Sequence, residues 1–205
     1  AKSMPYHALF YLALFTGMRR SELLALRWSD LDFLLCQLSI TRALHQLQDG
    51  SRIFRQPKTA KGRRLISLSP STTIVLEEHR ERQEQIRQSI GSTLTEDDLV
   101  FCHEDGTPLL PNTVSHAWTK LANRAGLKGI RLHDARHTHA SLMLKQGIHP
   151  KIVQERLGHG SIQITLDTYS HVAPGLQQAA ANRFDEIVLT KHQYNTEKEA
   201  KEIVG

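Results

Sequence analysis

One stretch of the sequence, residues 132–172, gathers side chains that could bind and attack a phosphate diester. His133 and Arg136 are three residues apart, His159 follows a glycine, and Tyr169 lies ten residues beyond it. Guanidinium and imidazole groups can bind phosphate oxygens, and a tyrosine hydroxyl can act as a nucleophile when a base or nearby cations activate it. These residue types therefore predict chemistry on a phosphate group.

Each of these residues also has a simpler structural explanation. His133 and Arg136 would share one face at a helix start, where the backbone attracts anions. A helical arginine is usually solvated, however, and a single histidine usually belongs to a core. Gly158 and Gly160 permit an unusual backbone at His159, although Gly158 could merely end a helix. The spacing of these residues alone leaves both explanations open.

The composition indicates one globular domain with a basic surface. The chain has 205 residues, a formal charge of +5 and 12 histidines, which suits a polyanion partner but does not require one. No apolar run is long enough to span a membrane, and no signal peptide is visible. Cys36 and Cys102 are too few for a disulfide framework or a metal cage. We therefore expect a cytoplasmic protein without membrane association.

The pattern of apolar residues predicts a mainly α fold with a small three-stranded antiparallel β-sheet. Early prolines and late glycines mark several helix ends. We expect helices at residues 6–15, 21–28, 69–90, 112–126, 134–146, 150–157 and 176–188. Extended segments around residues 38–40, 53–54 and 65–68 predict three strands, joined by turns at 49–50 and 59–62. These elements must bring the upstream half of the chain to the phosphate-binding stretch.

The second turn of the predicted sheet is strongly basic. Lys58, Lys61, Arg63 and Arg64 all lie in it or beside it. A cationic hairpin tip could enter a DNA groove, and a turn solvated by water explains the same residues equally well. We expect Lys61, Arg63 and Arg64 to contact DNA.

Four ordered segments of the chain carry a resemblance to a known family. They are TGMRRSELLALRWSDLDF at residues 16–33, PKTAKGRRLISL at 57–68, LHDARHTHAS at 132–141, and LGHGSIQITLDTYSHV at 157–172. Together they resemble the catalytic domain of the tyrosine recombinase (phage integrase) family along nearly the whole chain. Within the family, the sequence pattern of these segments is most similar to that of integrases of conjugative transposons and temperate phages.

The resemblance implies an organisation for the chain. Residues 1–175 would form the DNA breaking-rejoining catalytic domain. Residues 176–205 would form a C-terminal helix and tail that docks on a neighbouring protomer or packs within its own chain. The N-terminal core-binding domain of the family would lie outside this chain.

The resemblance also implies how the phosphate is bound and attacked. Tyr169 would attack the scissile phosphorus and form a 3′-phosphotyrosyl link, which conserves bond energy, so no high-energy cofactor would be needed. The arginines Arg19 and Arg136 would take the place of the metal ions that many phosphoryl-transfer enzymes use. Arg19 and Arg136 would clamp the non-bridging oxygens, a task that suits the planar guanidinium group. Glu22, three residues after Arg19, would orient or balance the basic cluster.

Proton transfer would fall to the remaining residues of the motif. Lys58 would be the general acid for the departing 5′ oxygen, with Lys61 close enough in sequence to be an alternative. His133 would assist proton transfer with Tyr169, and His159 would donate a hydrogen bond to a phosphate oxygen.

The expected partners are double-stranded DNA at recombination sites and further copies of the protein in a tetrameric synaptic complex. Three other functions compete with this interpretation. One is a type IB topoisomerase-like enzyme that relaxes supercoils, and another is a DNA-binding module without catalysis. The third is a metal-dependent hydrolase that would use His133, His137 and His139, whose spacing is not a common metal-ligand pattern.

Overall fold

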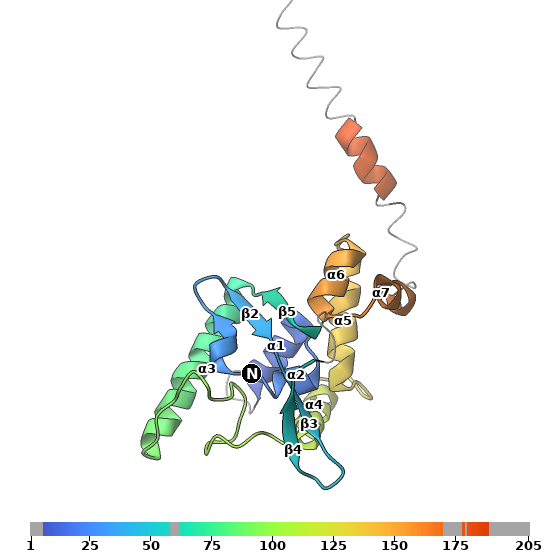
Figure 1. Ribbon diagram of the computed structural model, residues 1–205. Coiled ribbons are helices and arrows are strands. Elements are labelled where there is room, and N and C mark those ends of the chain that lie inside the picture. Colours follow the sequence, from blue (N-terminus) through green and yellow to red (C-terminus); the bar gives the residue numbers. More distant parts are fainter. Residues whose placement is uncertain (1–5, 58–61, 170–177, 179, 189–205) are drawn as a thin grey trace, which may run out of the picture.

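In the computed structural model of the chain, the described residues are 6–57, 62–169, 178 and 180–188, with only the backbone described at 168 and 169. The fold is mainly helical with small antiparallel sheets, which confirms the predicted fold class (Figure 1). None of the described helices combines the length and the apolar character needed to cross a lipid bilayer.

Along the described part of the chain, five short strands lie between two short N-terminal helices and a C-terminal series of helices. The helices are α1 (His7–Thr16), α2 (Arg20–Leu23), the 3-10 turn η1 (Trp28–Asp30), α3 (Pro70–Ser89), α4 (Pro111–Arg124), α5 (Leu132–Lys145), α6 (Pro150–Leu157) and α7 (Ile162–Tyr169). The strands are β1 (Leu31–Asp32), β2 (Gln37–Ile40), β3 (Ala43–Gln46), β4 (Arg52–Arg55) and β5 (Arg64–Ser67). Residues 180–188 are also helical.

The strands form two antiparallel sheets where the sequence predicted one. The first sheet has the order β1-β2-β5, with Leu38 opposite Ile66, and the second is the β3-β4 hairpin. The chain leaves the first sheet between β2 and β3, where Thr41 Oγ1 and Arg42 Nη1 donate hydrogen bonds of 3.0 and 2.6 Å to the Asp30 carboxylate. The predicted strand at residues 53–54 therefore pairs with β3, and its hairpin projects from the body of the fold (Figure 1).

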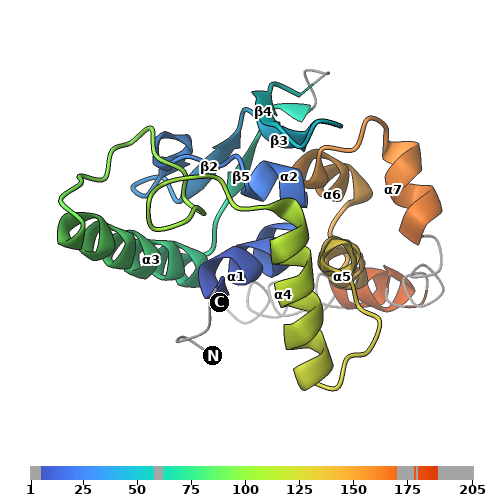
Figure 2. The same ribbon diagram turned by 90° about the horizontal axis from the view of Figure 1, so that it is seen from below.

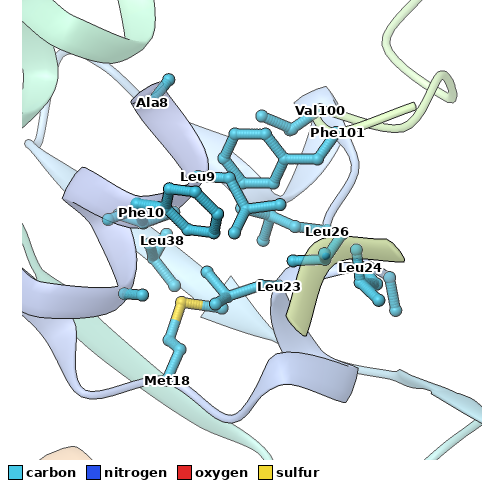
Figure 3. Packing of buried hydrophobic residues seen from close by; sticks show 14 of the residues in the cluster. Ala8, Leu9, Phe10, Met18, Leu23, Leu24, Leu26, Leu38, Val100 and Phe101 are labelled. Carbon is cyan, nitrogen blue, oxygen red and sulfur yellow. The ribbon is translucent and has the colours of Figure 1, made fainter. Parts of the chain in front are cut away.

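The helix α1 is the centre of the hydrophobic core. It lies between α3 and α5, and it contacts both (Figure 2). Leu9 and Phe10 of α1 pack with Leu23, Leu26 and Leu38, all of them buried (Figure 3). Full burial of such a side chain contributes roughly 1.5–3 kcal/mol to stability. This packing fixes the C-terminal end of α1 and the start of α2, from which the first candidate site residue projects.

The helix α2 is much shorter than predicted. It ends at Leu23, because the following residues pair with a distant segment of the chain. The Val100 N–H donates to the Leu26 carbonyl at 2.9 Å, and the Trp28 N–H donates to the Asp98 carbonyl at 3.1 Å. These bonds extend the backbone of residues 26–28, so the apolar side chains that suggested a helix are buried in another conformation.

A second, smaller group of buried residues joins α5 to α6. It consists of Ala140 and Leu144 from α5 and Val153 and Leu157 from α6. This packing brings the C-terminal end of α6 beside the C-terminal end of α1. The site described next lies where these two helix ends meet.

Candidate active site

Arg19 is the residue immediately before α2, and Glu22 in the first turn of the helix holds it. The Arg19 backbone N–H donates to Glu22 Oε2 at 2.8 Å, and Arg19 Nη1 donates to Oε1 at 2.8 Å. Arg19 Nη2 donates to the Gly158 carbonyl at 3.1 Å. The Arg19 side chain is 38% exposed, so its guanidinium group is held in place and is still accessible from solvent.

Arg136 lies deeper, in the second turn of α5, and is only 4% exposed. Its Nη1 donates to the Gly17 carbonyl at 2.7 Å, and its Nη2 donates to the Leu157 carbonyl at 2.8 Å. Both carbonyls lie at helix ends, where the last C=O groups lack partners within the helix. Arg136 therefore connects the end of α1 to the end of α6 and places a buried positive charge between these two helix ends.

His159 follows the residue that ends α6. Gly158 has φ 66°, the left-handed conformation that suits glycine, and the turn at this position buries His159 to 9% exposure. His159 Nδ1 lies 2.8 Å from Thr165 Oγ1 in α7, and Gln154 Nε2 donates to the His159 carbonyl at 2.8 Å. Thr165 therefore holds the imidazole ring, and Gln154 holds the backbone of His159.

The surroundings of His159 keep its ring neutral. Burial lowers the pKa of His159 to about 4, and the positive charges of Arg136, Arg19 and Arg64 act in the same direction. A neutral imidazole can still donate one N–H hydrogen bond. His159 is therefore suited to hydrogen bonding with a phosphate oxygen at neutral pH.

Glu22 is a buried carboxylate that remains ionised. Burial acts to raise the pKa of Glu22, but hydrogen bonding and charge from Arg64 and the charge of Arg19 outweigh it, and the pKa is lowered. Arg19 and Arg64 thus share one negative side chain, and Arg136 adds a further positive charge nearby, at the Leu157 carbonyl. The excess positive charge favours an anionic ligand here.

His133 and Arg19 line the same open cleft, which has a volume of about 490 Å³. Burial lowers the pKa of His133, as do the neighbouring His137 and Arg136. The cleft also has Arg20 and Arg131 in its lining, two basic residues that the sequence did not single out. Its complete lining is Met18, Arg19, Arg20, Ser21, Ser115, Thr119, Arg131, Leu132 and His133.

Three of the predicted residues cannot be placed by their side chains. Lys58 and Lys61 lie outside the described residues. Tyr169 is the last residue of α7, but its side chain lies outside what the structure describes. The bond between His159 and Thr165 connects α7 to the end of α6, so the helix that carries Tyr169 is anchored to the cationic cluster.

Arg63 and Arg64 are neighbours with opposite surroundings. Arg63 is exposed, as a DNA contact requires, whereas the Arg64 side chain is only 6% exposed. Arg64 Nη1 and Nη2 donate to the two oxygens of Glu22 at 3.1 and 2.9 Å, and Arg64 Nε donates to the Arg156 carbonyl at 2.7 Å. This position corrects the expected DNA contact of Arg64, because its guanidinium faces the protein interior.

The structure adds residues to the site that the sequence did not reveal. Thr165 is fully buried beside His159, and nothing in the mixed polar and apolar sequence of α7, IQITLDTY, distinguishes it from the other polar residues of that helix. The Gly17 carbonyl accepts a hydrogen bond from Arg136. Gly17 also has no room for a side chain, because a Cβ there would lie 2.6 Å from Leu157 Cδ2. The Thr16-Gly17 pair signals a helix end in the sequence, but its distant partner cannot be read there.

The three histidines of the proposed metal site do not point to one place. His133 and His137 have ring centroids 4.8 Å apart. His139 instead has Nδ1 3.0 Å from the Leu14 carbonyl, and its Nε2 accepts from Arg156 Nε at 3.1 Å. Both ring nitrogens of His139 are therefore occupied by protein groups.

Comparisons with known proteins show the family of the chain. A sequence model of the phage integrase family matches residues 1–175. The ICEBs1 integrase of Bacillus subtilis is 32% identical over 183 residues, which is 89% of this chain and 49% of that protein. A "tyrosine recombinase XerC-like" protein of Caldanaerobacter subterraneus subsp. tengcongensis is 33% identical over 193 residues, with the same coverage of 89% and 49%.

A solved structure shares the fold. The Tn1549 transposon integrase, in complex with transposon right end DNA, superposes with a TM-score of 0.73 at 22% identity, covering 87% of this chain and 58% of that one. The chain spans about half the length of the curated relatives it matches. Because the family match covers most of the sequence, the chain belongs to the phage integrase (tyrosine recombinase) family.

Proposed function

We propose that this chain is the catalytic domain of a site-specific DNA recombinase that moves a mobile genetic element. It cleaves and rejoins DNA strands through a 3′-phosphotyrosyl intermediate, without a metal or a high-energy cofactor. The observation that carries this proposal is the convergence of Arg19, Arg136 and His159 on one backbone segment, residues 157–159. Family membership and the DNA-bound state of the Tn1549 integrase support it.

The described side chains suit a phosphate in the transition state. Arg19 reaches the cleft and binds a non-bridging oxygen, while the buried Arg136 supplies charge from below. Fixed cations of this kind stabilise the negative charge that develops on the phosphoryl group, and no reorganisation is needed during the reaction. The neutral His159 donates a hydrogen bond to the same group. Arg20 and Arg131 extend the basic lining along the DNA backbone.

Tyr169, His133 and Lys58 supply the reacting groups. Tyr169 Oη attacks the phosphorus, and the 5′ oxygen leaves. A phenol with a pKa of about 10 is mostly protonated at neutral pH, so it needs a proton acceptor, and His133 serves that purpose. Lys58 protonates the leaving oxygen. In rejoining, the free 5′ hydroxyl attacks the phosphotyrosyl bond and restores the tyrosine.

The organisation of the protein follows from the same proposal. Residues 1–175 form the catalytic domain, an extent that the family match supports. Residues 176–205 dock on a neighbouring protomer within a tetramer assembled on DNA. In support, Phe184, Ile187 and Val188 are 67%, 58% and 45% exposed on the helical segment 180–188, and large apolar groups of this kind favour a protein partner. The protein acts on DNA in the cytoplasm.

A nicked duplex carrying the end of the element tests the proposal. Cleavage next to a nick releases a short strand, so the covalent protein–DNA adduct accumulates and shifts in a denaturing gel. We expect an adduct with the wild-type chain and none with Tyr169→Phe. An equal adduct with both proteins would contradict the recombinase assignment.

A second assay separates the competing activities. A supercoiled plasmid with two element ends should yield recombinant products, and a plasmid without them should stay supercoiled. Relaxation of the plasmid without ends, with no recombinant from the other, would identify a topoisomerase. Binding to either DNA without any adduct would identify a DNA-binding module.

A further inference from the structure

Arg64 occupies a buried position between α2 and the end of α6. All its described hydrogen bonds are to protein groups: both oxygens of Glu22, the Arg156 carbonyl and, at 3.4 Å, the Gly62 carbonyl. A Cβ built at Gly158 would lie 2.7 Å from Arg64 Nη1, so the guanidinium packs directly against the backbone of the α6 end. Arg64 therefore touches the segment that Arg19 also binds.

Glu22 is shared by two arginines, and it has no capacity for more. Oε1 accepts from Arg19 Nη1 and Arg64 Nη1, and Oε2 accepts from the Arg19 N–H and Arg64 Nη2. A carboxylate offers about four acceptor sites, so these four bonds use all of them. Only one amino group of Arg19 can bind Glu22 as long as Arg64 is in place. The other, Nη2, is directed to Gly158 O, next to His159.

We propose that Arg64 is a positioning residue for Arg19, which binds the phosphate in the proposed function. By occupying one site on each Glu22 oxygen, it prevents Arg19 from chelating the carboxylate with both amino groups and keeps Arg19 Nη2 at Gly158. Its Nε bond to Arg156 also fixes the turn that carries His159. Arg64 begins β5 six residues after Lys58, so the same side chain anchors the strand that follows the proposed general acid. The effect of Arg64 on catalysis rests on the proposed function, whereas its effect on the position of Arg19 does not.

Two substitutions separate the geometry of Arg64 from its charge. Arg64→Met removes the charge and both amino groups. Arg64→Lys keeps the charge, but a single ammonium group cannot span both carboxylate oxygens in the way a guanidinium does. In both variants a Glu22 site becomes vacant, and we expect Arg19 to turn Nη2 from Gly158 to Glu22. Because removal of one partner from a buried pair is strongly destabilising, Arg64→Lys is the variant that retains the fold if Arg64→Met unfolds.

Arg63 provides a matched control, since it carries the same charge one residue away and is exposed. At saturating nicked duplex, we expect Arg64→Lys to slow single-turnover adduct formation by about 10²-fold, the usual cost of an active group misplaced by about 1 Å. The DNA Kd should stay within about twofold, because Arg64 does not reach solvent. Arg63→Met should show the reverse, with weaker binding and an unchanged rate at saturation.

Epistasis with Arg19 distinguishes positioning from a general structural effect. If Arg64 acts through Arg19, then Arg64→Lys should add less than about threefold to the loss caused by Arg19→Ala, since residues that act as a unit are not additive. The same loss in both backgrounds would overturn the inference, as would a higher Kd with an unchanged rate.

A crystal structure of the Arg64→Lys protein provides the decisive readout, and it does not depend on activity. Arg19 bound to Glu22 through both amino groups would support the inference, and an unchanged bond from Arg19 Nη2 to Gly158 would overturn it. If the wild-type protein forms no adduct, the proposed function fails, while the position of Arg19 still decides the inference about Arg64.

Discussion

Arg19 and Gly158 are 139 residues apart in the chain, and the Arg19 Nη2 donates a hydrogen bond of 3.1 Å to the Gly158 carbonyl. This bond joins the start of α2 to the end of α6. It places an accessible cation beside His159, whose ring is bonded to Thr165 in the helix that ends at Tyr169. The stretch for which the sequence predicts phosphate binding is therefore joined to a residue from near the N-terminus.

Gly158 should tolerate no side chain. A Gly158→Ala substitution places a Cβ 2.7 Å from Arg64 Nη1 and forces alanine to a φ of +66°. The left-handed backbone alone costs roughly 1–2 kcal/mol for a non-glycine residue. We expect the free energy of unfolding, measured by urea titration, to fall by at least that amount.

Gly160 is the matched control for this substitution. A Cβ there would meet nothing within 4 Å, and its φ is not in the left-handed range. Gly160→Ala should therefore change the stability by less than about 0.5 kcal/mol. Equal losses for Gly158→Ala and Gly160→Ala would show that the contact between Gly158 and Arg64 is not the cause.

Thr165 should matter for the orientation of His159. Thr165→Val keeps the shape of the side chain but removes the hydroxyl that lies 2.8 Å from His159 Nδ1. We expect a loss of about 1 kcal/mol in stability and about a tenfold slower adduct formation, because the His159 imidazole loses its hydrogen bond to Thr165. Thr138→Val, which alters an exposed threonine of α5, should leave the adduct rate unchanged. A wild-type rate in Thr165→Val would remove Thr165 from the site.

The protein should lose stability in mild acid. Burial lowers the pKa of His159 and of His139 to about 4, with further contributions from Arg136 and from Arg156 respectively. The unfolded chain has histidine pKa values near 6.5, so between about pH 6.5 and 4 the unfolded state binds more protons than the folded state. Stability is therefore complete above about pH 6.5 and falls as the pH decreases toward 4.

The variant His139→Gln tests whether histidine protonation causes the loss of stability in acid. It removes one titrating ring while leaving the proposed catalytic residues in place. Urea titrations at pH 7.5 and pH 5 should show a smaller difference in unfolding free energy for His139→Gln than for the wild type. An unchanged difference would assign the pH dependence to other groups.

Removal of divalent metal ions should leave the reaction intact. The proposed mechanism places arginine side chains where many phosphoryl-transfer enzymes use metal ions. We expect the rate of adduct formation to change by less than about twofold in excess EDTA, a criterion that reflects ordinary assay precision. A rate abolished by EDTA and restored by added Zn²⁺ or Mg²⁺ would return the hydrolase interpretation to consideration.

Local signals in the sequence were sufficient to predict where most helices begin and end. Pro70 and Pro150 mark the starts of α3 and α6, and Gly17 and Gly158 follow the ends of α1 and α6, because proline and glycine have fixed backbone preferences. The end of α2 could not be predicted in this way. It depends on backbone bonds between residues 26–28 and 98–100, which no local pattern reveals.

The candidate site was predictable in part for the same reason. Spacing suggested Arg136 and His159 as site residues, and the family resemblance added Arg19; the fold brings these three together. The environment of Arg64 was not predictable, because its burial depends on Glu22, 42 residues earlier, and on the Arg156 carbonyl, 92 residues later. A basic residue in a basic turn resembles a DNA contact until the position of the opposing carboxylate is known.

In the proposed reaction, Tyr169 forms a covalent link to the 3′ end of the cleaved DNA strand. Peptide mapping of the adduct from the nicked duplex by mass spectrometry tests this most directly. We expect one modified peptide, with a 3′-phosphonucleotide on Tyr169 and a free 5′ hydroxyl on the released strand. A nucleotide on another residue, or a 5′ linkage, would contradict it.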